Sequence, residues 1–169
     1  MILTIRRGVE ADIPTLQALE RDAAQAFRTI GYDFCADGPV RSDQEHERGL
    51  RDGAIFVAEV NAHPAGFILL WLIDGCAHIT EVSVSGAFQK RGVGRALIEA
   101  AENWATSSGF NEITLTTFSE VAWNAPFYNT LGYRVFTPGN AHIELAAVQA
   151  EEAKSGFNVK PRVAMIKVL

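Results

Sequence analysis

Residues 89–95, which read Gln-Lys-Arg-Gly-Val-Gly-Arg, are the stretch that decides the fold. They stand between an apolar segment, predicted as a strand over 76–84, and a segment of helical period that begins at Val93. The two glycines leave room for a phosphate at the backbone, and the free N–H groups at a helix start attract anions. Three basic side chains with no acid among them add positive charge. The stretch therefore predicts a polyphosphate-binding turn between a strand and a helix.

The spacing of the glycines excludes two common phosphate loops. A Walker A loop ends in Gly-Lys-Ser/Thr, but here Gly94 is followed by Arg-Ala. A dinucleotide fingerprint needs Gly or Ala at the sixth position counted from Gly92, and that position holds Leu97. The pattern that does match is Gln/Arg-x-x-Gly-x-Gly/Ala, through Gln89 and the two glycines.

The surrounding sequence predicts a mixed α/β fold. Strands are expected at 2–6, 54–60, 65–73, 76–84, 113–117, 133–136 and 163–168, with a hairpin turn at Asp74-Gly75. Helices are expected at 13–30, at 42–51, from Val93 to Gly109, after Asn124, and at 143–154, with Asp12 and Asn124 as N-caps. These segments predict one domain over 1–169, with a mixed, mostly antiparallel sheet of about six to seven strands flanked by helices.

Composition narrows the function classes. The chain has 169 residues and a formal net charge of −5, which argues against a general nucleic-acid binder. Its longest apolar run, 65–73, is far shorter than the ~20 residues of a membrane-spanning helix, and the first residues lack a signal-peptide layout. Two cysteines suit a reduced compartment, and the histidines and cysteines lack metal-ligand spacing. We therefore expect a cytoplasmic protein with no metal, nucleic-acid or membrane partner.

The turn at 89–95 resembles the pyrophosphate loop of the GNAT superfamily of N-acetyltransferases, which holds the diphosphate of acetyl-coenzyme A. Two further segments carry the resemblance. Residues 81–84, Glu-Val-Ser-Val, are similar to the family's Glu-x-x-Val strand, and residues 124–133, Asn-Ala-Pro-Phe-Tyr-Asn-Thr-Leu-Gly-Tyr, to its Asn, Phe-Tyr and Leu-Gly-Phe/Tyr motif. One departure is Gly86, which stands where the family commonly has a proline. The resemblance spans about residues 2–136, and the closing strand also fits.

The resemblance implies that acetyl-coenzyme A is the co-substrate. The implied contacts come from the backbone of one strand, from the phosphate turn and from one asparagine: Val82, Val84, Gln89, Lys90, Arg91, Gly92, Val93, Gly94, Arg95 and Asn124. Because no cysteine falls in the matched motifs, we expect direct transfer in a ternary complex rather than an acetyl-enzyme intermediate.

The reaction implied is attack of a primary amine on the acetyl thioester. A free primary amine has a pKa of about 10, so it must lose a proton before it attacks. Glu81 is the expected base, because an acid in an apolar strand is costly unless it is paired or useful. The alternatives are a structural, ion-paired Glu81 and a base role for His78. Strand alternation places Glu81 and Ser83 on one face.

Tyr128 is the expected proton donor to the coenzyme A thiolate, by resemblance to the family. Phe127 and Leu131, four residues apart, are expected to pin the short helix to the core and leave Tyr128 pointing elsewhere. The alternative is a half-buried tyrosine with its hydroxyl in water. Asn124 is likewise either a helix cap or a coenzyme contact.

The acceptor side is less defined. Residues 31–60 carry seven acids against three arginines, and in the resembled fold this region roofs the acceptor pocket. Tyr32, Phe34, His78 and Trp123 are therefore the expected substrate residues, with an ordinary solvated loop as the alternative. The predicted acceptor is a small-molecule primary amine. A protein N-terminus or lysine, and a non-catalytic coenzyme A-binding sensor, are the alternatives. Apolar residues of 143–150 are assigned to core packing, with a homodimer contact as the alternative.

Overall fold

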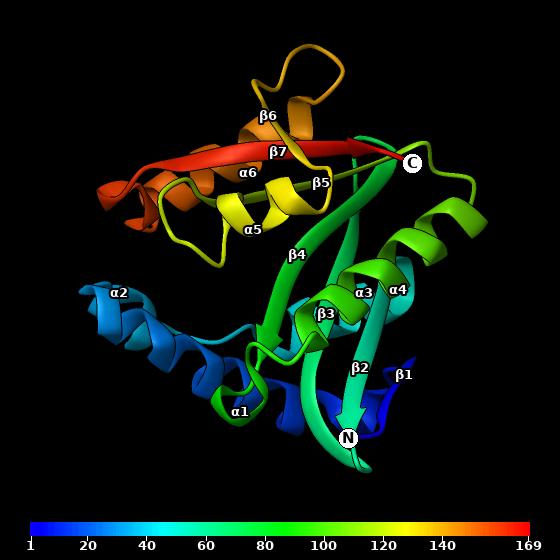
Figure 1. Cartoon of the computed structure of the whole chain (residues 1–169). Coiled ribbons are helices and arrows are strands. Elements are labelled where there is room, and N and C mark those ends of the chain that lie inside the picture. Colours follow the sequence, from blue (N-terminus) through cyan, green and yellow to red (C-terminus); the bar gives the residue numbers. More distant parts are fainter. The chain divides into compact units, whose positions relative to one another are not determined.

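The structure is a computed structural model that describes all 169 residues (Figure 1). Its strands are β1 (Leu3–Arg7), β2 (Ala54–Val60), β3 (His63–Ile73), β4 (Cys76–Val84), β5 (Glu112–Phe118), β6 (Arg134–Phe136) and β7 (Arg162–Val168). They form a seven-stranded sheet in the order β1-β2-β3-β4-β5-β7-β6. β4 and β5 run parallel, whereas β1–β2, β2–β3, β5–β7 and β6–β7 are antiparallel pairs. The predicted mixed, mostly antiparallel sheet is confirmed.

The helices are α1 (Ile13–Ala24), α2 (Asp33–Ala36), α3 (Asp43–Asp52), α4 (Val93–Ser107), α5 (Ala125–Thr130) and α6 (Ile143–Lys154). The helix expected at 13–30 is α1 followed by a 3₁₀ segment, Gln25–Ile30, and Gly31 ends it with a φ of +74°. Helix α2 was not predicted, because four residues make about one turn and show no period. No helix has both the length and the hydropathy needed to cross a bilayer.

Asp12 stands at the N-cap position of α1 as predicted, but its side chain makes no cap hydrogen bond to the helix. Its carboxylate accepts the Val9 N–H at 2.9 Å and takes both terminal nitrogens of Arg6 at 2.8 and 2.9 Å. The hydrogen bond from Arg6 is the largest of the effects that hold the pKa of Asp12 below its ordinary value. The carboxylate therefore stabilises β1 and the turn before α1, and it does not bond to the N–H groups at the start of the helix.

Packing divides the chain into two compact units, which are described one at a time: residues 1–71 with 81–104, and residues 72–80 with 105–169. The core of the first unit is made by α1, β2 and β3 through Leu16, Leu19, Ile55, Val57, Phe67 and Leu69. Helix α3 comes close to β3, since a Cβ on Gly49 would lie 2.2 Å from Leu69 Cδ1. This close approach fixes the segment that precedes α3, which carries part of the candidate site.

In the second unit, the hairpin turn between β3 and β4 also starts α6. Asp74 and Gly75 have φ values of +54° and +72°, as a tight two-residue turn requires. The Asp74 carboxylate accepts the N–H groups of Glu144 at 2.8 Å and Leu145 at 2.9 Å, while the Glu144 carboxylate accepts the Asp74 N–H. The predicted turn is confirmed, and its second role satisfies N–H groups that a helix start otherwise leaves without partners.

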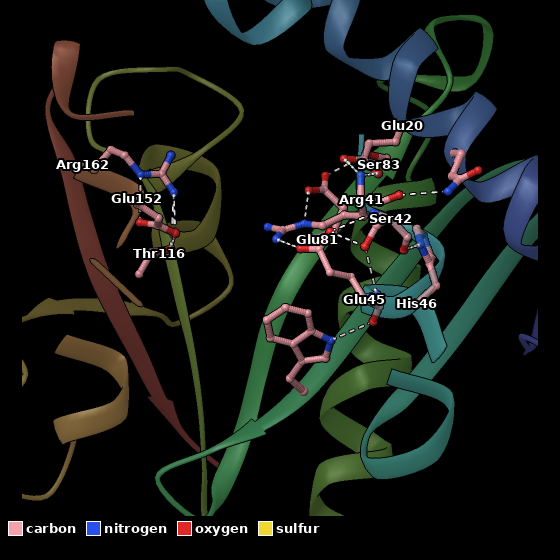
Figure 2. Close-up of polar contacts among 12 residues, drawn as sticks. Glu20, Arg41, Ser42, Glu45, His46, Glu81, Ser83, Thr116, Glu152 and Arg162 are labelled. Carbon is pink, nitrogen blue, oxygen red and sulfur yellow. Dashed lines mark hydrogen bonds and ion pairs between the residues drawn. The ribbon is translucent and has the colours of Figure 1, made fainter. Parts of the chain in front are cut away.

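Arg162 joins β7 to α6 within the same unit. Its guanidinium lies 4.6 Å from the ring centre of Phe118 and 5.3 Å from that of Phe157, and it pairs with Glu152 at 3.3 Å (Figure 2). Glu152 also accepts the Thr116 hydroxyl at 2.6 Å. These contacts fix the last strand of the chain beside β5.

Candidate active site

The predicted strand–turn–helix is present around residues 89–95. α4 begins at Val93, whose side chain is buried, and Lys90, Arg91 and Arg95 are exposed. Lys90 and Gly92 take left-handed backbone angles, with φ of +59° and +84°. A Cβ on Gly92 would meet nothing within 4 Å, so the space in front of the turn is open. Exposed cations and an open helix start together suit an anionic ligand.

Two hydrogen bonds hold the turn in place. The Gln89 side-chain amide donates to the Val84 carbonyl at 3.0 Å, which ties the turn back to the end of β4. The Gly86 N–H donates to the Asp22 carboxylate of α1 at 2.9 Å. A proline, which the resembled family commonly has at this position, has no N–H and could not make the second bond. The departure at Gly86 therefore fits a contact that this chain makes with α1.

Glu81 lies on β4 in the same compact unit, beside an arginine. Its Oε1 accepts the Ser83 hydroxyl at 2.9 Å, so the two residues share a face as strand alternation predicts. Its Oε2 lies 3.8 Å from the Nε of Arg41 (Figure 2). The Glu81 side chain is 24% exposed, so it is partly accessible. A partly accessible carboxylate can accept a proton from a ligand.

Arg41 is surrounded by carboxylates from three elements. Its Nη1 donates to Glu45 Oε1 of α3 at 2.9 Å, and its backbone N–H donates to both oxygens of Glu20 of α1 at 3.0 and 3.1 Å. Glu45 is itself fixed by the N-cap of α3, because its Oε2 accepts the Ser42 N–H at 2.8 Å. We call Glu20, Arg41, Glu45 and Glu81 the carboxylate cluster; Figure 2 shows them converging.

The cluster perturbs the ionisation of its members. Burial, and then the negative charge of Glu81, raise the pKa of Glu20 to about 8. Burial by itself lowers the pKa of Arg41, but the charge of Glu81 and the hydrogen bond to Glu45 outweigh it and raise that pKa. Burial raises the pKa of Glu45, yet hydrogen bonds from Ser42 and Arg41 hold it below its ordinary value. The cluster therefore favours the protonated form of Glu20 more than water does, and Arg41 stays charged.

Sequence reasoning missed Glu20 and Arg41. Glu20 is four residues after the buried Leu16, so its helical position places it beside the buried stripe of α1, a signal that could have found it. Arg41 lies in an irregular segment between α2 and α3, where no period shows which side chains turn inward.

Tyr128 is placed differently from the helical-wheel prediction. It is 8% exposed, whereas Phe127 and Leu131, expected to face the core, are only half-buried. Its ring packs edge-on against Tyr133, with 5.6 Å between ring centres. Helix α5 has six residues, too few for a wheel to decide which face is buried. The wheel prediction is wrong, and Tyr128 is a core aromatic of the second unit as well as the candidate acid.

Asn124 stands at the N-cap position of α5 but makes no side-chain cap. Its side-chain amide donates to the Trp123 carbonyl at 3.2 Å, so the capping prediction is wrong. With φ of −111° and ψ of −119°, its backbone departs from the extended geometry of a capping residue. Trp123, one of the expected substrate residues, is 40% exposed in the same unit.

The remaining expected substrate residues are buried or half-buried. His78 is buried in β4, with its Nδ1 2.9 Å from the Thr114 hydroxyl of β5. In the first unit, Tyr32 is buried and stacks on both Phe27 and Phe34, with ring centres 6.1 and 5.7 Å away. Tyr32 and Phe34 are thus brought together as part of an aromatic stack that follows α1.

Comparisons with known proteins agree on one family. A family model described as the acetyltransferase (GNAT) family matches residues 16–133. The PaiA N-acetyltransferase of Thermoplasma acidophilum, solved with coenzyme A, has 18% identity and a TM-score of 0.70, with 100% of both chains covered.

Two other similar structures have different acceptors in their names. The ribosomal-protein alanine N-acetyltransferase of Escherichia coli has 18% identity and a TM-score of 0.67 over 99% of this chain and 94% of that one. The N-acetylglutamate synthase of Neisseria gonorrhoeae, solved with coenzyme A and N-acetyl-glutamate, has 16% identity and a TM-score of 0.67 over 100% of this chain and 35% of that one. These likenesses show a shared fold.

Proposed function

Because the chain belongs to the acetyltransferase (GNAT) family, we propose that it moves the acetyl group of acetyl-coenzyme A to the primary amine of a small molecule. The observation that carries the proposal is the open, cationic turn at 89–95, which leads from β4 into α4. Similar structures solved with coenzyme A support acetyl-coenzyme A as the co-substrate.

The proposed coenzyme contacts follow from the chemistry of each group. The first N–H groups of α4 and the side chains of Lys90, Arg91 and Arg95 bind the diphosphate. Gln89 holds the turn against β4 through its bond to Val84. Backbone amides of Val82 and Val84 face the pantetheine and the developing oxyanion, and Asn124 adds a further contact; these assignments rest on the family resemblance.

The proposed reaction is a direct transfer in a ternary complex. Glu81 accepts a proton from the acceptor ammonium, directly or through water. The freed nitrogen attacks the thioester carbonyl, so that a C–N bond forms and the C–S bond breaks. The Tyr128 hydroxyl gives a proton to the departing thiolate. The attacking nitrogen then loses its second proton, which restores the Tyr128 hydroxyl, and Glu81 releases the first proton to solvent. The products are an N-acetylated amine, coenzyme A and one proton.

The acceptor class is tested by measuring thiol release from acetyl-coenzyme A across a panel of small amines and peptides. A small-molecule acceptor is expected to give the highest kcat/KM, while peptides with a free N-terminus or lysine give little release. The second candidate, a protein acceptor, is supported by the shared fold with the alanine N-acetyltransferase. It replaces the first candidate if peptides give the highest kcat/KM. Binding of acetyl-coenzyme A without thiol release for any acceptor would support a coenzyme A-binding sensor.

Three further expectations from the sequence stay predictions: a single domain over 1–169, a cytoplasmic location and a homodimer contact.

Tyr128→Phe is expected to lower kcat by about 10-fold or more and to leave acetyl-coenzyme A affinity within about 3-fold, because it removes only a proton donor. Thiol release and calorimetric titration measure the two effects. Tyr133→Phe is the matched control, since Tyr133 packs edge-on against Tyr128 in the same unit. Equal kcat values for Tyr128→Phe and the wild type would remove Tyr128 from the mechanism.

A further inference from the structure

We infer that Arg41 and Glu20 are positioning residues for Glu81. At neutral pH the two glutamates share one proton: the positive charge of Arg41 favours the ionised form of Glu81, and Glu20 holds the proton. The inference rests on the proposed function, in which Glu81 is the base. It adds two residues, from α1 and from the segment before α3, that the family motifs in this sequence do not include.

The geometry distinguishes the two glutamates. The guanidinium of Arg41 pairs with Glu81, with the Nε 3.8 Å from Oε2, and the backbone N–H of Arg41 donates to Glu20. The charge of Arg41 also acts on Glu20, but Glu81 has the larger electrostatic effect on Arg41. A guanidinium stabilises a negative charge more than one peptide N–H does, because it carries a full positive charge. The Ser83 hydroxyl adds a further donor to Glu81 at 2.9 Å. The charged form is therefore favoured at Glu81 and the protonated form at Glu20.

The charges around the pair make a single proton the stable arrangement. The acids that converge on Arg41 in this unit are Glu20 from α1, Glu45 from α3 and Glu81 from β4. Glu45 and Glu81 both act on the charge of Glu20. With every acid ionised, three negative charges would share one guanidinium that is only 30% exposed. Like charges in a partly buried cluster do not all ionise, so one carboxyl retains its proton. The raised pKa of Glu20, about 8, agrees with this assignment.

The arrangement suits a base that must be ionised when the acceptor arrives. A proton stored on Glu20 leaves Glu81 able to accept the amine proton at neutral pH. Above about pH 8, Glu20 also ionises, and its charge strengthens the attraction of Glu81 for a proton. Glu20 and Arg41 thus act through Glu81, and neither needs to touch the substrate.

The test is the titration of glutamate side-chain carboxyl carbons by ¹³C NMR in the full-length protein. In the wild type, one glutamate is expected to titrate near pH 8, and Glu20→Gln removes its resonance. Glu81→Gln moves that midpoint down by about one pH unit or more, because a neighbouring negative charge is lost. Arg41→Gln moves it up, because a positive charge is lost, and Arg41→Lys restores much of the wild-type value. A structural role alone would not produce opposite shifts.

Arg48→Gln is the matched control. Arg48 lies on α3 and packs 4.1 Å from the ring centre of Trp71, the ring that Arg41 also approaches at 5.8 Å. Its removal is expected to leave the Glu20 midpoint unchanged. A wild-type spectrum without a glutamate that titrates above about pH 6.5 overturns the inference, as do shifts of the same sign in Glu81→Gln and Arg41→Gln.

Steady-state rates separate this inference from the proposed function. In Glu20→Gln, the pH profile of kcat/KM is expected to lose its step near pH 8. In Arg41→Gln, the midpoint of the acidic limb of that profile is expected to move to higher pH. If the NMR midpoints shift as expected but Glu81→Gln retains full activity, the proton-sharing pair stands and the assignment of Glu81 as base fails.

Discussion

Glu81→Gln is expected to lower kcat at neutral pH by about 100-fold or more, the range in which a positioned general base contributes. Glutamine keeps the size of the side chain and an acceptor oxygen for the Ser83 hydroxyl, but it cannot take a proton from the amine. The loss is expected to shrink at high pH, where the acceptor amine is already deprotonated. Thiol release at saturating acetyl-coenzyme A, measured across pH, reports both the loss of kcat at neutral pH and its decrease at high pH.

The control for this substitution is Glu99→Gln, on the exposed face of α4 in the same unit, which is expected to keep wild-type kcat. Calorimetry with acetyl-coenzyme A confirms that Glu81→Gln still binds the co-substrate. A kcat within about 3-fold of the wild type at neutral pH would assign Glu81 the structural role of an ion-paired acid beside Arg41.

Gly92→Val is expected to weaken acetyl-coenzyme A binding by about 100-fold. Its φ of +84° lies in the region that β-branched residues avoid, so the turn is strained or rearranged. The new side chain also projects into the open space where we place the diphosphate, since nothing lies within 4 Å of a Cβ at this position. Isothermal titration calorimetry measures the affinity, and thermal unfolding measures the cost of the strain.

Gly109 offers a closely matched control, because it follows α4 with the same φ of +84° and has the same open space where a Cβ would lie. Gly109→Val is expected to lower the melting temperature about as much as Gly92→Val does and to leave the affinity unchanged. An equal loss of affinity in both variants would show that general destabilisation, and not the phosphate turn, is responsible.

Local patterns predicted the elements that are fixed by local chemistry. β2, β4 and α6 have the predicted bounds, because apolar or periodic runs are closed there by turn residues such as Asp74-Gly75. The two predicted side-chain caps, at Asp12 and Asn124, are absent for a physical reason. A sequence shows that Asp12 and Asn124 carry suitable oxygens, but not that Arg6 and Val9 occupy the first or that the second bonds to Trp123.

For the candidate site, too, only the parts that depend on residues near one another in the sequence could be predicted. The phosphate turn and the shared face of Glu81 and Ser83 follow from contiguous residues and from strand alternation. The carboxylate cluster does not, because Glu20, Arg41 and Glu81 are 21 to 61 residues apart in the sequence and meet only when α1 and α3 pack on the sheet. Pairings of this kind are set by tertiary structure and leave no period in the sequence.

The reciprocal bonds between Asp74 and the start of α6 have a consequence for the order of folding. They join residues 70 apart in the chain, and the aspartate belongs to a turn that closes between adjacent strands. Short-range closure is fast, whereas contacts across long sequence separations form late. During synthesis, residues 63–84 emerge before residue 144, so the hairpin can close before the helix is made. We therefore expect helix α6 to form its first turn against the Asp74 turn rather than by nucleating alone.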